Sequence, residues 1–335
     1  MSIALKQGPC NHLGQEHPMR LNFSLTQLEY VLAVHKFGHF AKAAEHCSIT
    51  QPTLSMQIQK LEESLGVVIF DRSKKPILLT DAGAVIITQI QLVVSEAKKI
   101  DNILQMKSGD KLIGSLELGV IPTIAPYVLP KLLPLLVKKF PEIKLHIKEM
   151  QTQQIIEALN TDEIDVGLLA VPINVSKIIE LPIYFEPFSV LSNKEHGLAK
   201  LKKIKYSSLK ADDIWLLEEG HCLRNQVLDV CSLKADKLKN RNFQFESGNL
   251  ETLKNLISSY GGYTLLPWLA QDNLGKDTQL IDFERPIPAR EVGLAYRREH
   301  YKINLIKALG EAIFECIPDE LRKIKQKDLD VLPVD

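Results

Sequence analysis

The feature that most constrains the fold is an alternation of strand and helix patterns over residues 112–320. A strand ending near residue 120 precedes a Pro-rich helix over 126–140, and a second strand over 143–147 precedes a helix over 153–160. The apolar run at 164–169 then indicates a fully buried strand. This βαβαβ order predicts a parallel sheet covered by helices.

A similar pattern restarts near residue 189 and closes at 262–267. A last strand is expected over 292–296 and a final helix over 304–317. Two α/β lobes joined by crossings near 186–188 and 285–288 would leave a cleft, where ligands of such folds bind. We therefore predict a two-lobed, Rossmann-like domain over 110–320, followed by a C-terminal tail over 321–335.

Residues 23–80 predict a compact winged helix-turn-helix. Ser24 and Gln27 form a capping box at the first helix start, and Pro52 suits the first turn of the third helix. The buried stripe of that helix is formed by Leu54, Ile58, Leu61 and Leu65. Residues 67–70 and 76–79 flank a basic tip at 71–75, which is typical of a wing.

Residues 81–109 predict one long linker helix. Its apolar positions repeat with a heptad spacing at Ile86, Ile90, Val93, Ala97, Ile100 and Leu104. An amphipathic helix lying on its own core would give a wider stripe, so the regular 3.5-residue period favours pairing with a second subunit.

The composition is that of a globular protein with no membrane span. Hydrophobic residues make up 45% of the 335 positions, and 41 Lys and Arg balance 41 Asp and Glu. No run reaches the 18 or so apolar residues that a span requires. Residues 1–22 lack a signal-peptide core and are expected to be a disordered extension, with Met19 as an alternative start. We therefore expect a cytoplasmic protein.

The third helix and the wing offer a set of side chains suited to double-stranded DNA. Amides and hydroxyls on the polar helix face can read base edges, and basic wing residues can hold phosphates. The candidates are Gln51, Thr53, Ser55, Gln59, Arg72, Lys74 and Lys75. Residues 23–78 carry only six basic against five acidic side chains. This charge balance does not by itself indicate DNA binding, and a helix face that is simply solvated remains the alternative.

The cysteines point to redox chemistry at one place. Cys222 has His221 and Arg224 beside it, and neighbouring cationic groups favour the reactive thiolate. Oxidation by peroxide would give a sulfenic acid that condenses with a second thiol, for which Cys231 is the one candidate close in sequence. No spacing suggests a metal site or a cofactor. Cys10, Cys47 and Cys316 have no flanking pattern, and we interpret the latter two as packing residues.

Geometry adds a constraint on this pair. The segment between the two cysteines is expected to be helical, and nine helical residues span about 13–14 Å. A disulfide requires Cα atoms within about 7 Å. The pair could therefore close only if the helix unwinds, which would make the segment a switch between a reduced helix and an oxidised loop.

The order of motifs resembles that of LysR-type transcriptional regulators from residue 25 to about 317. The matching residues are Phe40-Ala41-Lys42-Ala43-Ala44, Gln51-Pro52-Thr53-Leu54-Ser55, Ile58, Leu61-Glu62, Leu65-Gly66, Phe70, Arg72, Leu79-Thr80 and Gly83. The resemblance implies a winged helix-turn-helix, a linker helix that pairs between subunits and a two-lobed regulatory domain like that of periplasmic binding proteins. One departure is His39, where most members carry Ser or Thr.

The stretch from Gly220 to Arg224 with Cys231 is similar to the branch of that family that senses hydrogen peroxide. That resemblance implies a peroxidatic Cys222, a resolving Cys231, and Thr123 and Thr152 as hydroxyls that hold peroxide near the sulfur. His221 and Arg224 would shape the pocket, and Gln153 departs from relatives with His there. Thr123 and Thr152 could instead be helix caps. The resemblance also implies promoter DNA, a dimer of dimers, and contacts with RNA polymerase and a thioredoxin- or glutaredoxin-type reductant.

Three other functions remain open at this point. A LysR-type regulator could bind a small effector in the cleft, with the cysteines incidental. A thiol peroxidase could use the same cysteine, but the winged unit and heptad helix would have no purpose there. A periplasmic solute-binding protein would explain the lobes but not the N-terminal third. The leading hypothesis is a peroxide-sensing regulator rather than an enzyme.

Overall fold

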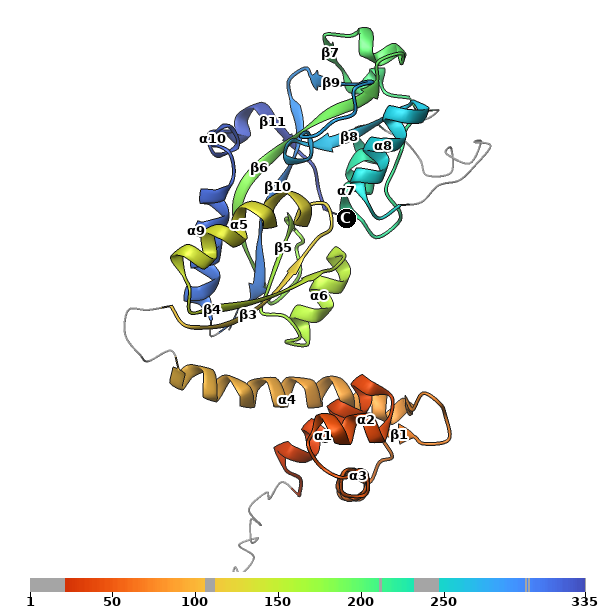
Figure 1. Cartoon of the computed structure of the whole chain (residues 1–335), viewed down its shortest axis with the longest axis vertical. Helices are drawn as coiled ribbons and strands as arrows, with labels where there is room; N and C mark the ends of the chain where they lie inside the picture. Colours follow the sequence, from red (N-terminus) through yellow and green to blue (C-terminus); the bar gives the residue numbers. More distant parts are fainter. Residues whose placement is uncertain are drawn as a thin grey trace, which may run out of the picture. The chain divides into compact units, whose positions relative to one another are not determined.

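The computed structural model describes residues 22–105, 112–210, 213–231, 247–298, 300 and 302–334 (Figure 1). The chain divides into two compact units, one up to Ala97 and one from Lys98. The predicted C-terminal part of the linker helix beyond residue 105 and the extension before residue 22 lie outside the described residues.

The first unit is the predicted winged helix-turn-helix. Its elements are α1 (Leu25–Phe37), α2 (Phe40–His46), α3 (Gln51–Leu65), β1 (Phe70–Asp71), β2 (Leu78–Leu79) and the N-terminal part of α4 (Asp81–Gln105). The capping box of Ser24 and Gln27 is formed as predicted. His39 caps α2, because its Nδ1 accepts the backbone N–H of Ala41 at 3.2 Å. The departure from the family pattern at His39 thus preserves the capping role that Ser and Thr favour.

The core of this unit lies between α1, α2, α3, the wing and α4. Leu54, Ile58 and Leu61 are fully buried on the predicted stripe, and Ile90 of α4 packs on the same cluster. Further along α4, Ile100 is 63% exposed. The N-terminal part of the heptad seam therefore packs on its own domain, while Ile100 presents an apolar side chain to solvent.

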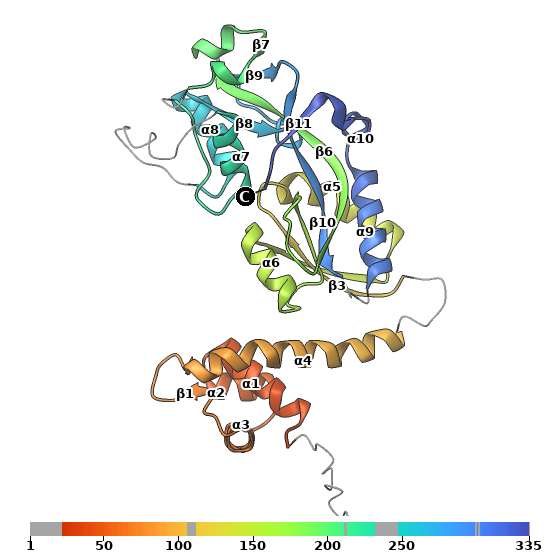
Figure 2. The ribbon, with the colours of Figure 1, turned by 180° about the vertical axis from the view of Figure 1, so that it is seen from behind.

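The second unit is built on a nine-stranded mixed sheet (Figures 1 and 2). The strands are β3 (Gly114–Val120), β4 (Ile143–Glu149), β5 (Val166–Val171), β6 (Ile178–Asn193), β7 (Lys203–Ile204), β8 (Tyr263–Pro267), β9 (Thr278–Phe283), β10 (Ile287–Arg297) and β11 (Leu329–Val331). The helices are α5 (Ala125–Lys139), α6 (Thr152–Asn160), α7 (Cys222–Val230), α8 (Leu250–Tyr260), α9 (Ile303–Cys316) and α10 (Asp319–Arg322). As predicted, β3 pairs in parallel with both β4 and β5.

Two long antiparallel strands connect the two lobes. The sixteen-residue β6 pairs with β10 over its first part and with β8 and β9 over its last. The sequence predicted a new pattern from residue 189 and a crossing near 186–188; in the structure one continuous strand passes through both lobes and changes its pairing there. Each lobe has its own hydrophobic core, and α7 touches both: Cys222 belongs to the core around β3, β5 and α9, and Cys231 to the core around β8 and α8.

In the part of the chain that the structure describes, no helix combines the length and the hydropathy needed to cross a membrane.

Candidate functional site

Cys222 is the first residue of α7 and is 5% exposed. Gly220 precedes it with φ of +93°, a conformation that favours glycine. A Cβ atom there would lie 2.4 Å from the side-chain oxygen of Gln151, the N-cap of α6. The glycine thus lets the loop pass close to the start of α6, where Thr152 lies.

A buried polar cluster holds a cation near this thiol. Arg290 on β10 and Glu186 on β6 occupy paired positions of adjacent strands, and their Nη2 and Oε2 atoms are 2.7 Å apart. Arg290 also donates to the hydroxyl of Thr123 at 2.9 Å and to the Thr123 carbonyl at 3.1 Å. All three residues are at most 1% exposed, so the guanidinium is fixed by partners on two other segments of the chain, Glu186 on β6 and Thr123 after β3.

Two opposing effects act on the Cys222 thiol. Burial raises its pKa above the ordinary value, whereas the Arg290 guanidinium, the Thr152 hydroxyl and the backbone N–H of Leu223 oppose that rise. By distance and angle, the buried Thr152 hydroxyl oxygen has no hydrogen-bond partner among the described residues. The site therefore keeps a neutral thiol at rest while surrounding the sulfur with groups that stabilise its thiolate.

The two cationic neighbours expected from the sequence point elsewhere. Arg224 donates from Nη1 to the carbonyl of Leu217 at 2.7 Å. His221 is buried, and its Nε2 lies 3.6 Å from a carboxylate oxygen of Glu218. The structure thus places Arg290, rather than Arg224, as the cation that acts on Cys222. Gln153 is exposed and faces Glu157 on α6.

Cys231 lies at the other end of α7 as its C-cap and is 5% exposed. Burial raises the pKa of this thiol to about 12, opposed by a hydrogen bond with the Tyr263 hydroxyl. Both cysteines are free thiols. The nine residues of α7 keep them about 13–14 Å apart along the helix axis, well beyond disulfide range.

Sequence reasoning missed Arg290, Glu186 and Tyr263. Each of the two charged residues lies among apolar neighbours in its strand, but Glu180, Glu291 and Arg297 share these strands, so the sequence does not single out the buried pair. Their pairing depends on the register between β6 and β10, two segments more than 90 residues apart that the sequence alone does not align.

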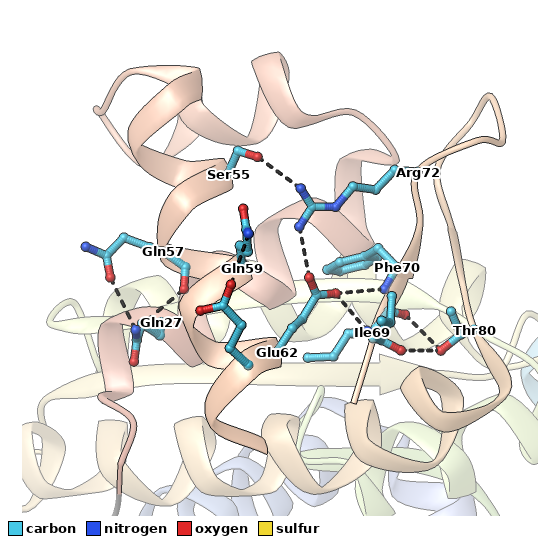
Figure 3. A network of polar contacts seen from close by, with 11 residues as sticks. Gln27, Ser55, Gln57, Gln59, Glu62, Ile69, Phe70, Arg72 and Thr80 are labelled. Atoms are coloured by element: carbon cyan, nitrogen blue, oxygen red, sulfur yellow. Dashed lines mark hydrogen bonds and ion pairs between the residues drawn. The ribbon is translucent and has the colours of Figure 1, made fainter. Parts of the chain in front are cut away.

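Three of the candidate DNA-reading residues, Ser55 and Gln59 on α3 and Arg72 on the wing, lie in one network of polar contacts (Figure 3). Arg72 from the wing donates from Nη1 to Ser55 Oγ at 3.2 Å and from Nη2 to Glu62 Oε2 at 2.9 Å. Glu62 in turn accepts the backbone N–H groups of Ile69 and Phe70 at 2.7 and 3.3 Å. Arg72 therefore joins the wing to α3 and holds Ser55, an arrangement that the sequence did not predict.

The other candidates lie along the first nine residues of α3 or at the wing tip. Thr53 bonds to Thr50 with 2.8 Å between their hydroxyl oxygens, and Gln59 donates to Glu63 at 3.0 Å. The exposed ones are Gln51, Pro52, Gln59, Lys74 and Lys75. The described residues thus present amides and hydroxyls on α3 next to lysines on the wing.

Comparison with known protein families matches both parts of the chain. Residues 25–84 match the bacterial regulatory helix-turn-helix protein model of the lysR family. Residues 109–315 match the LysR substrate binding domain model.

Similar proteins cover almost the whole chain. A hydrogen peroxide-inducible genes activator from Haemophilus influenzae is 33% identical over 90% of this chain and 98% of its own length. The DNA-binding transcriptional dual regulator OxyR of Escherichia coli K12 is also 33% identical, over 87% of this chain and 94% of its own length. A full-length OxyR variant from Pseudomonas aeruginosa superposes with a TM-score of 0.73 at 34% identity, covering 88% of this chain and 99% of that one.

Reduced OxyR from Porphyromonas gingivalis has a TM-score of 0.57 at 27% identity and covers 65% of this chain and all of the other. The two domain models match successive parts of this chain, and the relatives from Haemophilus influenzae and Escherichia coli extend over both parts. The chain therefore belongs to the lysR family of bacterial regulatory helix-turn-helix proteins.

Proposed function

We propose that this regulator senses hydrogen peroxide through a reversible disulfide between Cys222 and Cys231 and controls antioxidant genes. The observation that carries the proposal is the placement of two buried thiols at opposite ends of α7, one of them beside Arg290 and Thr152. The peroxide-responsive relatives support it. An effector-binding regulator would need neither thiol, and a thiol peroxidase would have no use for the helix-turn-helix unit at residues 25–84.

The chemistry has two steps. The Cys222 thiolate attacks one oxygen of hydrogen peroxide; the O–O bond breaks, Cys222 becomes a sulfenic acid, and the departing hydroxide takes up the thiol proton as water. Cys231 then attacks the Cys222 sulfur, an S–S bond forms, the S–O bond breaks, and a second water leaves. Arg290 stabilises the attacking thiolate, and the hydroxyls of Thr123 and Thr152 hold peroxide near the sulfur. His221 and Arg224 shape the pocket around Cys222.

The second step demands a conformational change. Cys222 packs in the core of the first lobe and Cys231 in that of the second. Closing the bond unwinds α7 and withdraws at least one of these side chains from its core, so oxidation changes the packing of both lobes. We propose that subunit contacts in a dimer of dimers pass this change to the DNA-binding units.

The remaining partners follow from this assignment. Gln51, Thr53, Ser55 and Gln59 read promoter bases, Pro52 sets the start of α3, and Lys74 with Arg72 serves the phosphate backbone. A nearly neutral DNA-binding unit gains affinity by repeated contacts in an oligomer. Activation involves RNA polymerase, and a cytoplasmic dithiol of the thioredoxin or glutaredoxin type supplies two electrons to restore the thiols.

Footprinting of one promoter with the reduced and oxidised protein tests the function. We expect a protected region whose extent or strength changes on adding peroxide, and no such change for Cys222→Ser or Cys231→Ser. Identical footprints for reduced and oxidised native protein would contradict the proposed function. A peroxide response that persists in Cys222→Ser would assign sensing to another site.

A further inference from the structure

The C-terminal segment, expected to be a tail, is part of the second unit. Strand β11 pairs in parallel with the start of β10, with Leu329, Asp330 and Val331 opposite residues 287–289. The Leu332 backbone N–H continues the ladder by donating to the Ala289 carbonyl at 2.9 Å. The side chain of Leu332 is 5% exposed in the second-lobe core. Pairing and burial together fix this segment in place.

Beyond β11 the segment reaches α7 (Figures 1 and 2). Gln226, the fifth residue of this helix, is 1% exposed, and its Nε2 donates to the carbonyl of Pro333 at 3.3 Å. Leu332 shares its cluster with Val227, and Val334 packs against the first-lobe core that contains Cys222. Residues 332–334 thus contact α7, the helix that separates the two thiols.

The structure shows these contacts with α7 in its helical form. Unwinding that brings Cys231 toward Cys222 moves Gln226, because it lies between them, and the bond to Pro333 breaks. On the side away from α7, the segment pairs with β10. In β10, Arg290 directly follows Ala289, the partner of Val331. The segment therefore joins the strand that carries the cation to the helix that carries the cysteines.

We propose that residues 332–334 form a strap that holds α7 in its helical, dithiol form and so limits how readily Cys231 reaches the oxidised Cys222. The inference rests on the proposed function and concerns its second step, in which the S–S bond replaces the S–O bond and water leaves. Gln226 is a positioning residue in this scheme, and the strap sets the peroxide dose at which the switch completes.

The test separates the two oxidation steps in the full-length dithiol protein. After a peroxide pulse, sulfenic acid is trapped with a carbon nucleophile, and disulfide is quantified by mass spectrometry over time. A chain that ends at Leu332 lacks the Pro333 carbonyl but keeps β11. We expect its disulfide to form about fivefold faster, because that factor corresponds to the net free energy of one hydrogen bond. The rate of sulfenic acid formation should be unchanged.

Two further variants control for folding. Leu332→Ala loosens the strap without shortening the chain and is expected to accelerate disulfide formation in the same direction; it decides the outcome if the shortened chain does not fold. Asp328→Asn breaks the exposed ion pair with Arg285, 3.0 Å long, before the strap begins and should leave both rates unchanged.

The outcomes distinguish the strap from the proposed function. An unchanged disulfide rate in the strap variants, with disulfide still forming in the native chain, overturns the strap. Equal acceleration of both steps also overturns it, because that result indicates general loosening. Absence of a Cys222–Cys231 disulfide in the native chain overturns the proposed function instead.

Discussion

Arg290 donates from Nη1 to the hydroxyl of Thr123 at 2.9 Å, while its Nη2 pairs with Glu186 at 2.7 Å. This relationship fixes a positive charge in the buried interior, close enough to act on the Cys222 thiol. A buried cation held in this way stabilises a developing thiolate more effectively than a mobile surface cation, because it requires no reorganisation when the charge forms.

Removal of that charge is expected to slow the first oxidation step. In Arg290→Met the Cys222 thiolate loses its cation, and the rate of sulfenic acid formation at neutral pH should fall by at least about tenfold. Arg290→Lys keeps the charge and should retain more of the rate. Stopped-flow measurement of peroxide consumption under single-turnover conditions checks this order, and equal rates for native protein and Arg290→Met would show that Arg290 has no role at the sulfur.

The raised pKa of Cys222 predicts a pH dependence. Because burial places this pKa above its ordinary value of 9.0, the thiol is mostly protonated at neutral pH, and the thiolate fraction grows as pH rises. The first-step rate should increase about tenfold per pH unit from pH 7 and reach no plateau below pH 9. A rate that is flat between pH 7 and 9 would indicate a thiolate already formed in the resting protein.

The buried ion pair should matter for stability more than the surface pairs do. Glu186→Gln leaves the Arg290 charge without its counter-ion and is expected to lower the free energy of unfolding by about 3 kcal/mol. Arg285→Ala, at an exposed pair with Asp328, should change it by less than about 1 kcal/mol. Urea denaturation of the two variants measures both values, and similar small losses would contradict the buried-pair account.

On the DNA side, Ser55 and Lys74 are expected to behave differently. Ser55→Ala removes a candidate base contact and should reduce discrimination between the specific site and a base-substituted site by about 1–3 kcal/mol. Lys74→Ala should weaken binding to all sequences and lower the salt slope by about 1. Titrations at several salt concentrations separate the two effects; a uniform loss in both variants would contradict the assigned roles.

Arg72 combines these roles, because it contacts both Ser55 and Glu62. Arg72→Ala leaves the 8% exposed Glu62 without its cation and frees the Ser55 side chain. We expect weaker discrimination together with lower thermal stability of the first unit, measured by DNA titration and thermal unfolding. Retained discrimination in Arg72→Ala would show that Ser55 needs no such support.

Local signals in the sequence were sufficient for much of the fold. The capping box at Ser24, Pro52 in the first turn of α3 and the alternation of strand and helix all act over a few residues, and each matched the structure. The sequence also singled out Cys222 and Cys231 and the helix between them. It failed at the partners of Arg290 and at the strap, because these depend on strand registers between distant segments.

The same limit explains the assignment of the charged neighbour. Adjacency in sequence suggested Arg224 as the cation near Cys222, yet the first turn of α7 directs Arg224 to the carbonyl of Leu217. The effective cation comes from β10, 68 positions further along the chain. Only tertiary structure brings these two residues together.

The central claim is that peroxide links the two ends of α7. Its most direct test is peptide mapping by mass spectrometry of the full-length protein treated with micromolar peroxide, with Cys222→Ser and Cys231→Ser as controls. The account predicts a Cys222–Cys231 linked peptide in native protein, a trapped sulfenic acid on Cys222 in Cys231→Ser, and neither product in Cys222→Ser. Native protein that responds to peroxide without forming this linked peptide would contradict it.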